Sequence, residues 1–296
     1  MALSDGDRAM LDGERGPAAR MAMRLIVQMA RVLEAPRLID IRSAHIDGCL
    51  YHGEAGLDFA ERLAEWSGRV VVPTTLNVSS LDLLHPERYR GDPETARRAR
   101  RLMDAYVALG CTPTWTCAPY QHPAHRPAFG DHIAWAESNA IVFANSVLGA
   151  RTNRYGDFID ICAALTGRVP DAGLHRAEQR RARLLFQLQD VPERLLHEDV
   201  LYPVLGHLIG LESGSRVPAI AGLPATTTED QLKALGAAAA SSGAVALFHA
   251  VGVTPEAATL EDAFQNSGPE VVIPVTPERL AQARDSLSST REGSLA

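Results

Sequence analysis

Apolar and polar residues alternate along the first half of the chain in blocks that predict helices and strands in turn. Between Gly16 and Leu33 apolar side chains recur every four residues, which is the spacing of one buried helix face. Residues 56–66 and 93–109 are also predicted to be helical, whereas 37–41 and 69–72 are short apolar runs typical of strands. Strands that alternate with helices favour an α/β fold with a largely parallel sheet.

A change in this pattern suggests two domains. Charged residues and Pro192 interrupt the alternation over 187–197, and 296 residues exceed the length of a typical single domain. We therefore expect one α/β domain at 1–190, carrying the site motifs, and a second α/β domain at 191–296. The elements predicted there are strands at 244–251 and 271–274, a helix at 277–287 and a polar tail at 288–296.

Three polar motifs follow predicted strands. They are residues 45–49, 74–77 after the run 69–72, and 117–120 after a predicted strand at 112–116. Ligands of parallel sheets bind beyond the carboxyl ends of the strands, so these motifs are expected to share one site. The second motif offers two hydroxyls and an amide, from Thr74, Thr75 and Asn77. These groups are predicted to bind a carboxylate or a hydroxyl of a ligand. The alternative is that they form a turn that closes the strand.

Residues 132–158 are predicted to begin as a helix and to end in a polar loop. The apolar face of this helix is interrupted by five polar residues, namely Glu137, Ser138, Asn139, Asn145 and Ser146. Ser and Asn are poor helix-interior residues, because their side chains compete for backbone hydrogen bonds. Arg151, Asn153 and Arg154 follow, and guanidinium groups match carboxylates. The segment is expected to bind a small anion; a polar helix terminus at a domain interface and surface ion pairs are the alternatives.

Three of these motifs together resemble a known family. The sequences at 145–154, 73–77 and 116–120 are similar in kind and order to the large subunit of aconitase X, within the aconitase superfamily of iron-dependent dehydratases. The resemblance runs from about Leu11 to the last residue. It implies aconitase-like three-layer α/β domains with largely parallel sheets, and a second domain at 191–296 that is incomplete relative to the family.

The resemblance also implies an activity. The sequence His-Ile-Asp-Gly-Cys-Leu-Tyr at 45–51 is similar to that of cis-3-hydroxy-L-proline dehydratases, which would make the product 1-pyrroline-2-carboxylate. The archaeal branch of the family instead acts on mevalonate 5-phosphate, which remains an alternative. A non-catalytic binding or assembly module of the same fold is a third possibility.

A cofactor and a partner follow from the same resemblance. An iron ion or iron–sulfur cluster would act as a Lewis acid on the leaving hydroxyl, with Cys117 and Cys49 as ligands. The partner would be the small subunit, a swivelling domain that supplies a serine base. The substrate would be a small hydroxy acid.

Four residues are candidates for proton transfer. His45 and Asp47 are close in sequence and are predicted either to act as an acid and its orienting partner or to hydrogen-bond the leaving hydroxyl. The alternative is a loop histidine that caps backbone groups. Glu137, with Ser138 beside it, is predicted either to accept the proton or to support the residue that does.

Composition excludes some function classes. The formal net charge of −7 argues against nucleic acid as the main partner. The sequence has no apolar signal region and no apolar run of membrane-spanning length, and its four cysteines show no CxxC pairing. A cytoplasmic protein that keeps its thiols reduced is therefore expected.

Overall fold

The computed structural model describes residues 1–287, so the predicted tail at 288–296 lies outside the described residues. Contacts divide the chain into two compact units. The first unit comprises Met1–Ile141 and Ala150–Gln179, and the second comprises Val142–Gly149 and the chain from Arg180 onward. The boundary between the units, at Gln179 and Arg180, thus lies about ten residues before the predicted boundary at 190. None of the helices within 1–287 combines the length and apolar character needed to cross a membrane.

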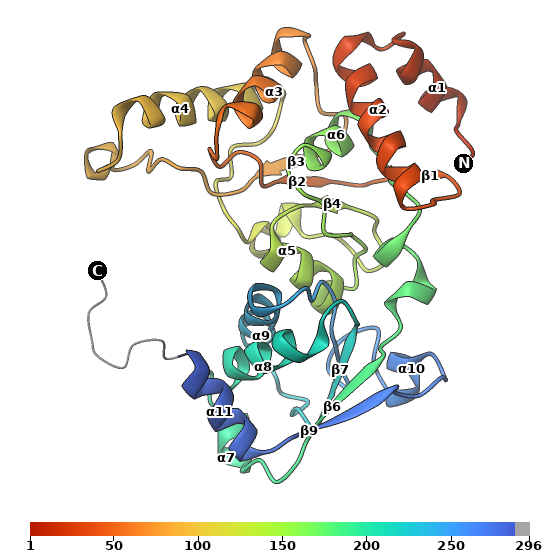
Figure 1. Ribbon diagram of the computed structural model, residues 1–296, viewed down its shortest axis with the longest axis vertical. Helices are drawn as coiled ribbons and strands as arrows, with labels where there is room; N and C mark the ends of the chain where they lie inside the picture. The colour runs from red at the N-terminus through yellow and green to blue at the C-terminus, as the bar shows by residue number, and fades with distance from the viewer. Residues whose placement is uncertain (288–296) are drawn as a thin grey trace. The chain divides into compact units, whose positions relative to one another are not determined.

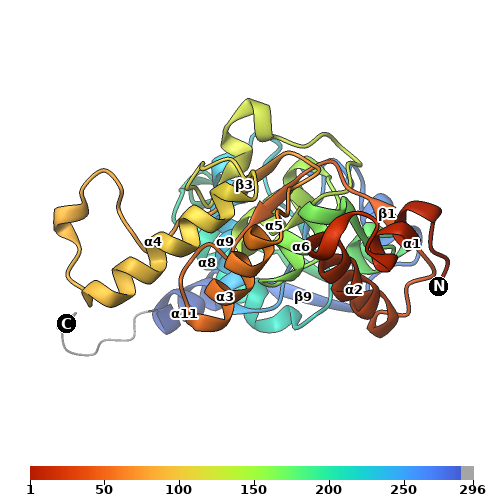
Figure 2. The ribbon, with the colours of Figure 1, turned by 90° about the horizontal axis from the view of Figure 1, so that it is seen from above.

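Helices of the first unit form where the apolar spacing predicts them. α2, α3 and α4 confirm the three predictions at 16–33, 56–66 and 93–109. Asp92 begins α4 by accepting a hydrogen bond from the Thr95 N–H, with Pro93 in the first turn. Figure 2 shows α3 and α4 packed side by side. The helices are α1 (Asp5–Asp12), α2 (Gly16–Val32), α3 (Glu54–Glu65), α4 (Pro93–Ala108) and α6 (Ile159–Thr166).

The strands of the first unit are short. β2 (Ala44–Ile46) lies between β3 (Thr74–Leu76) and β4 (Ala134–Trp135), and both pairings are parallel. β1 (Leu38–Asp40), predicted at 37–41, pairs in antiparallel fashion with β5 (Arg168–Pro170). The α/β class with largely parallel sheets is therefore confirmed, with one antiparallel pair as an exception.

Three predictions of local structure in this unit are wrong. Residues 69–72 form no strand, because the N–H groups of Val70 and Val71 bond separately to Leu109 and Ala164, and β3 begins only after Pro73. Residues 112–116 contribute a single bridge to β3, and Trp115 has a φ of 47°, which extended backbone does not adopt. Residues 132–137 hold β4 rather than a helix start. The helix α5 (Ser138–Phe143) follows and passes into a π-helical segment at Ala144–Leu148.

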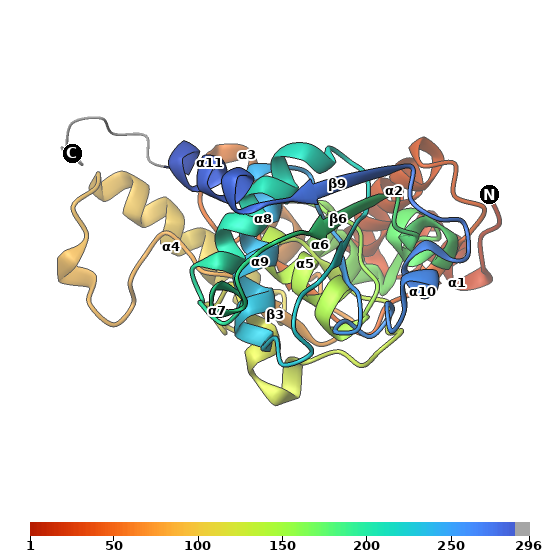
Figure 3. The same ribbon diagram turned by 90° about the horizontal axis from the view of Figure 1, so that it is seen from below.

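The second unit is a parallel sheet with helices on both faces (Figures 1 and 3). Its order is β8 (His249–Ala250), β7 (Pro218–Ala221), β6 (Leu184–Leu188) and β9 (Val271–Val275). Leu184 and Phe186 pack with α8 (Leu201–Ser213) and α9 (Glu229–Ser242), whereas Leu185 packs with Phe264 of α10 (Leu260–Phe264). Alternate residues of β6 thus face two helix layers. The remaining helices are α7 (Glu193–Leu196) and α11 (Pro277–Leu287), the latter beside α8.

Two helices of the second unit approach each other closely. A Cβ atom at Gly206 of α8 would overlap the carbonyl group of Leu235 in α9, so only glycine permits this contact. The strand predicted at 244–251 is reduced to β8, because the backbone of Ala246 and of Phe248 bonds to side chains instead of to a neighbouring strand. The strand at 271–274 and the helix at 277–287 are confirmed.

Candidate functional site

The sheet β3-β2-β4 has one apolar face and one polar face. Ala44, Ile46 and Leu76 belong to the hydrophobic core, which α2 and α6 cover (Figure 1). Successive side chains of a strand point to opposite faces. Thr75, His45 and Trp135, which are paired across the three strands, therefore form a row on the other face. We call this the first row.

A second row of polar side chains lies just beyond the strand ends. The pairing continues there, since the Asn77 N–H donates to the Ile46 carbonyl at 2.9 Å and the Ala136 N–H to the His45 carbonyl at 3.2 Å. Asn77, Asp47 and Glu137 are each two residues after a member of the first row, so they follow on the same face. The Asn77 amide donates to the Asp47 carboxylate. The sequence motifs at 45–49 and 74–77 are thus brought together with Glu137.

His45 is fully buried and held neutral. Its Nδ1 lies 2.8 Å from Oγ1 of Thr75, and its Nε2 has no hydrogen-bond partner within residues 1–287. Burial, reinforced by nearby His125, lowers the pKa of His45 from 6.5 to about 3. The predicted pairing of His45 with Asp47 is wrong: Thr75 is the partner of the imidazole, and Asn77 is the partner of the carboxylate.

A carboxylate that the sequence did not single out fixes the loop after β2. Asp160 of α6 is fully buried and accepts hydrogen bonds from the Asp47 N–H at 2.9 Å and the Gly48 N–H at 3.4 Å. Burial raises the pKa of Asp160 to about 7. The sequence did contain a signal, because Asp160 is the one acid within the apolar run Ile159–Leu165. Acidic side chains are almost never fully buried unless they have partners.

Glu137 stands at the start of α5. Its Oε2 accepts from the Ala140 N–H at 2.6 Å and its Oε1 from the Ser138 hydroxyl at 3.3 Å. Burial, and to a lesser extent the negative charge of Asp47, raises the pKa of Glu137. Asn139 joins the third motif to this helix, because its amide donates to the Cys117 carbonyl at 3.3 Å.

The thiols in the structure do not complete an iron site. The Cys117 thiol is exposed, so a metal ion could reach it. Cys49 is buried, with its Sγ 3.3 Å from the Asn77 carbonyl oxygen and 3.5 Å from that of Ile46, and burial raises its pKa. In this structure Cys49 is therefore a thiol directed at backbone carbonyl groups. Within residues 1–287, no group of three or more His, Cys, Asp or Glu side chains is arranged to hold a metal ion.

Three predicted binding residues lie elsewhere. Thr74 points to the apolar face and donates to the Val72 carbonyl at 2.8 Å. Asn145 and Ser146 belong to the second unit, where the Asn145 amide donates to the Ala246 carbonyl at 2.9 Å and the Ser146 hydroxyl accepts from the Phe248 N–H at 2.9 Å. Their polar atoms hold backbone in place.

Hydrogen bonds to neighbouring backbone fix most of the loop at residues 151–154. Asn153 donates to the Ala172 carbonyl at 3.0 Å and accepts from the Leu174 N–H at 2.7 Å, so it fixes a turn. Arg151 donates to the His175 carbonyl at 3.1 Å. Arg154 is exposed and forms no hydrogen bond or ion pair with the described part of the chain. Of this group, Arg154 keeps a guanidinium available for a ligand.

Comparison with protein families identifies both parts of the chain. A family described as aconitase X first domain matches residues 1–178, and one described as aconitase X second domain matches residues 182–285. The solved structure of Thermococcus kodakaraensis aconitase X in its holo form superposes with a TM-score of 0.86 at 35% identity. The match covers 98% of this chain and 70% of that one.

Two curated relatives are dehydratases. The chain is 49% identical to a cis-3-hydroxy-L-proline dehydratase of Pseudomonas aeruginosa over 97% of its length. It is 39% identical to a phosphomevalonate dehydratase large subunit of Methanosarcina mazei over 92% of its length, which is 66% of that subunit. The chain spans about half the length of the Pseudomonas relative, 49% of it.

Proposed function

The chain belongs to the aconitase X family, and on that premise we propose that it forms one wall of the active site of a dehydratase. The proposed substrate is cis-3-hydroxy-L-proline, which loses its α-proton and its β-hydroxyl to give an enamine that tautomerises to 1-pyrroline-2-carboxylate. The higher identity to the hydroxyproline enzyme, 49% against 39% for the phosphomevalonate enzyme, supports this substrate over the alternative. The observation that carries the proposal is the second row, which gathers two carboxylates and an amide on one sheet face.

Within this proposal Glu137 accepts the α-proton. A general base works best when its pKa lies near the operating pH, and burial moves the pKa of Glu137 in that direction. Asp47 accepts a hydrogen bond from the substrate hydroxyl, held in place by Asn77 and by the contacts of its loop with Asp160. His45 is neutral, so it serves as a hydrogen-bonding group and not as an acid.

We also propose the predicted iron or iron–sulfur group and the small-subunit partner for the whole protein. The relative from Methanosarcina mazei is named as a large subunit, which supports a partner. The described residues offer one exposed thiol, Cys117, and no complete ligand set. The roles of Glu137 and Asp47 given above do not depend on that group.

Turnover of the two candidate substrates tests the proposal. The protein is purified anaerobically, alone and after co-expression with the small subunit, and is mixed with cis-3-hydroxy-L-proline or mevalonate 5-phosphate. Product is followed by NMR, and iron is measured in the same samples. Formation of 1-pyrroline-2-carboxylate supports the proposal. Turnover of mevalonate 5-phosphate alone establishes the alternative, and bound iron without turnover of either substrate favours the binding module.

A further inference from the structure

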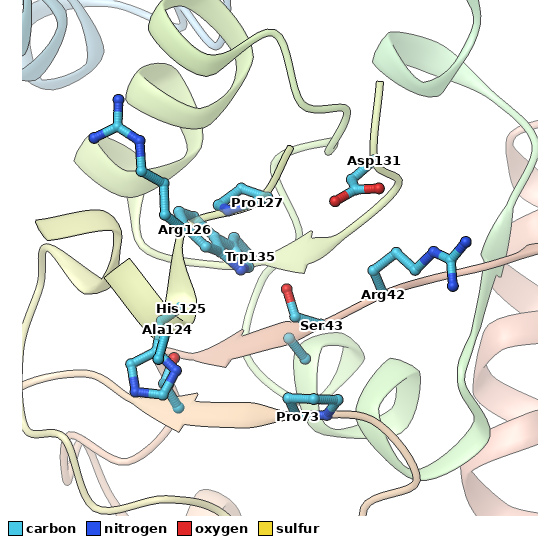
Figure 4. Close-up of a pocket in the computed structure, with 11 residues that line it drawn as sticks. Arg42, Ser43, Pro73, Ala124, His125, Arg126, Pro127, Asp131 and Trp135 are labelled. Atoms are coloured by element: carbon cyan, nitrogen blue, oxygen red, sulfur yellow. The ribbon is translucent and has the colours of Figure 1, made fainter. Parts of the chain in front are cut away.

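A pocket in the first unit lies against the polar face of the β3-β2-β4 sheet, on the amino-end side of the first row. Its volume is about 160 Å³. Ser43 and Pro73, which directly precede β2 and β3, line it together with Thr75 and Trp135 (Figure 4). Asp47, Asn77 and Glu137 do not line it. The pocket is therefore distinct from the second row, although the same sheet face supports both.

The pocket wall contains a buried donor without an acceptor. The Trp135 side chain is 1% exposed, and within residues 1–287 no acceptor reaches its Nε1–H. Beside Trp135 in the first row, the buried Nε2 of His45 also has no partner in that part of the chain. Buried polar groups in native proteins are hydrogen-bonded in the great majority of cases. A donor of this kind on a pocket wall points to an occupant that accepts hydrogen bonds.

The other polar groups of the pocket favour an anion. Arg42, His125 and Arg126 line it against a single acid, Asp131, whose carboxylate accepts from the Ala128 N–H at 2.9 Å. Arg42 is exposed, and its guanidinium forms no hydrogen bond or ion pair with the described residues. Figure 4 shows the Ser43 hydroxyl and the Trp135 ring facing the same space. The guanidinium groups of Arg42 and Arg126 point away from this space in the same view, so the donors on it are the Ser43 hydroxyl and the Trp135 indole N–H.

We propose that this pocket binds the carboxylate group of a small monoanionic acid. The Trp135 indole N–H and the Ser43 hydroxyl donate to its oxygens, and Arg42, at the edge of the pocket, adds a positive charge nearby. Two neutral donors and the neighbouring Asp131 suit one negative charge better than the two charges of a phosphate. The proposal requires neither iron nor turnover.

Indole N–H resonances test this site directly. The chain has three tryptophans, at 66, 115 and 135, so ¹⁵N labelling gives three indole signals to follow. Sodium acetate is titrated into the protein at constant ionic strength, with sodium chloride as the blank and inorganic phosphate as the competing anion. We expect acetate to move the Trp135 signal downfield in a saturable manner and to leave the Trp66 signal unchanged.

Two variants make the result specific. Trp135→Phe removes the N–H but keeps most of the ring and identifies the signal, and Ser43→Ala should weaken acetate binding about threefold to tenfold. Ser138→Ala, outside the pocket, should leave acetate affinity unchanged. The proposal is overturned if acetate gives no saturable shift, if phosphate binds more tightly than acetate, or if Ser43→Ala binds like the parent protein. Since no turnover is measured, failure here leaves the proposed dehydratase function untouched, and the reverse also holds.

Discussion

Buried polar side chains from the two units illustrate two different environments. In the second unit Arg180 is 1% exposed, and its guanidinium bonds to Glu256 at 2.6 Å and to both the side chain and the carbonyl group of Asn145, at 3.1 and 2.9 Å. In the first unit His45 and Trp135 are as deeply buried, yet each keeps a ring nitrogen without a partner within residues 1–287.

The difference separates two uses of buried polarity. A polar group whose hydrogen bonds are completed inside the protein stabilises the fold, whereas one left incomplete beside a cavity can be completed by a ligand. Asn145 and Glu137 belong to the same segment, and the sequence predicted a binding or catalytic role for both. The contacts show that the hydrogen bonds of Asn145 are completed inside the protein. Glu137 instead lies on the sheet face that carries the incompletely bonded His45 and Trp135.

The largest expected effect is on the stability of the second unit. Glu256→Ala leaves the buried Arg180 guanidinium without its carboxylate, so we expect the free energy of unfolding to fall by about 3–5 kcal/mol in urea titrations. Glu270→Ala is the control, because its ion pair with Arg183 is half exposed, and it should change stability little. Equal effects of the two variants would contradict the structural role given to the Arg180–Glu256 pair.

On the polar face of the first unit, substitutions should reduce activity and spare stability. Under the proposed function, Glu137→Gln removes the base and Asp47→Asn weakens the contact with the substrate hydroxyl. We expect kcat to fall about 10²- to 10⁴-fold for Glu137→Gln, with the free energy of unfolding changed by less than about 1 kcal/mol. The exposed Glu178→Gln serves as control for both measurements. If Glu137→Gln lowered the free energy of unfolding as strongly as it lowered activity, Glu137 would be a structural residue and the proposed role as base would be contradicted.

The neutral state of His45 predicts how stability depends on pH. Its pKa is about 3 in the folded protein and near 6.5 in the unfolded chain, so between these values only the unfolded state binds the proton. The free energy of unfolding therefore decreases as the pH falls, and this residue accounts for about 2 kcal/mol between pH 7 and pH 5. Urea titrations at both pH values should show a smaller loss for His45→Gln, while His85→Gln, with an exposed imidazole, behaves like the parent.

The smallest expected effect compares two serines of the same stretch. Ser146→Ala leaves the buried Phe248 N–H without its acceptor and should lower the free energy of unfolding by about 1 kcal/mol. Ser138→Ala removes a hydroxyl that bonds to the partly exposed Glu137 and should lower it by less. Chemical denaturation of both variants measures the difference, and the reverse order would argue that Ser146 is not structural.

The helices could be predicted from the sequence because their apolar spacing repeats over many residues, as in α2 and α4. Strands of two to five residues carry a weaker signal, which is why the run at 69–72 was taken for a strand when β3 lies just beyond it. The spacing of two residues between His45 and Asp47, and between Thr75 and Asn77, was visible in the sequence. Only the parallel register aligns these pairs as rows, and only packing reveals Asp160 beneath them.

The alternation in β2 limits how this gene can change its length. One codon inserted or deleted among Arg42, Ser43 and Ala44 would shift the strand by one position against β3 and β4. Ala44 and Ile46 would then turn toward the cavity, and His45 and Asp47 would enter the apolar core beneath α6. Point substitutions at these positions can be judged one at a time, but a single-residue insertion would reverse the whole face at once. In-frame length variation in this family should therefore be confined to the loops beyond the three strands.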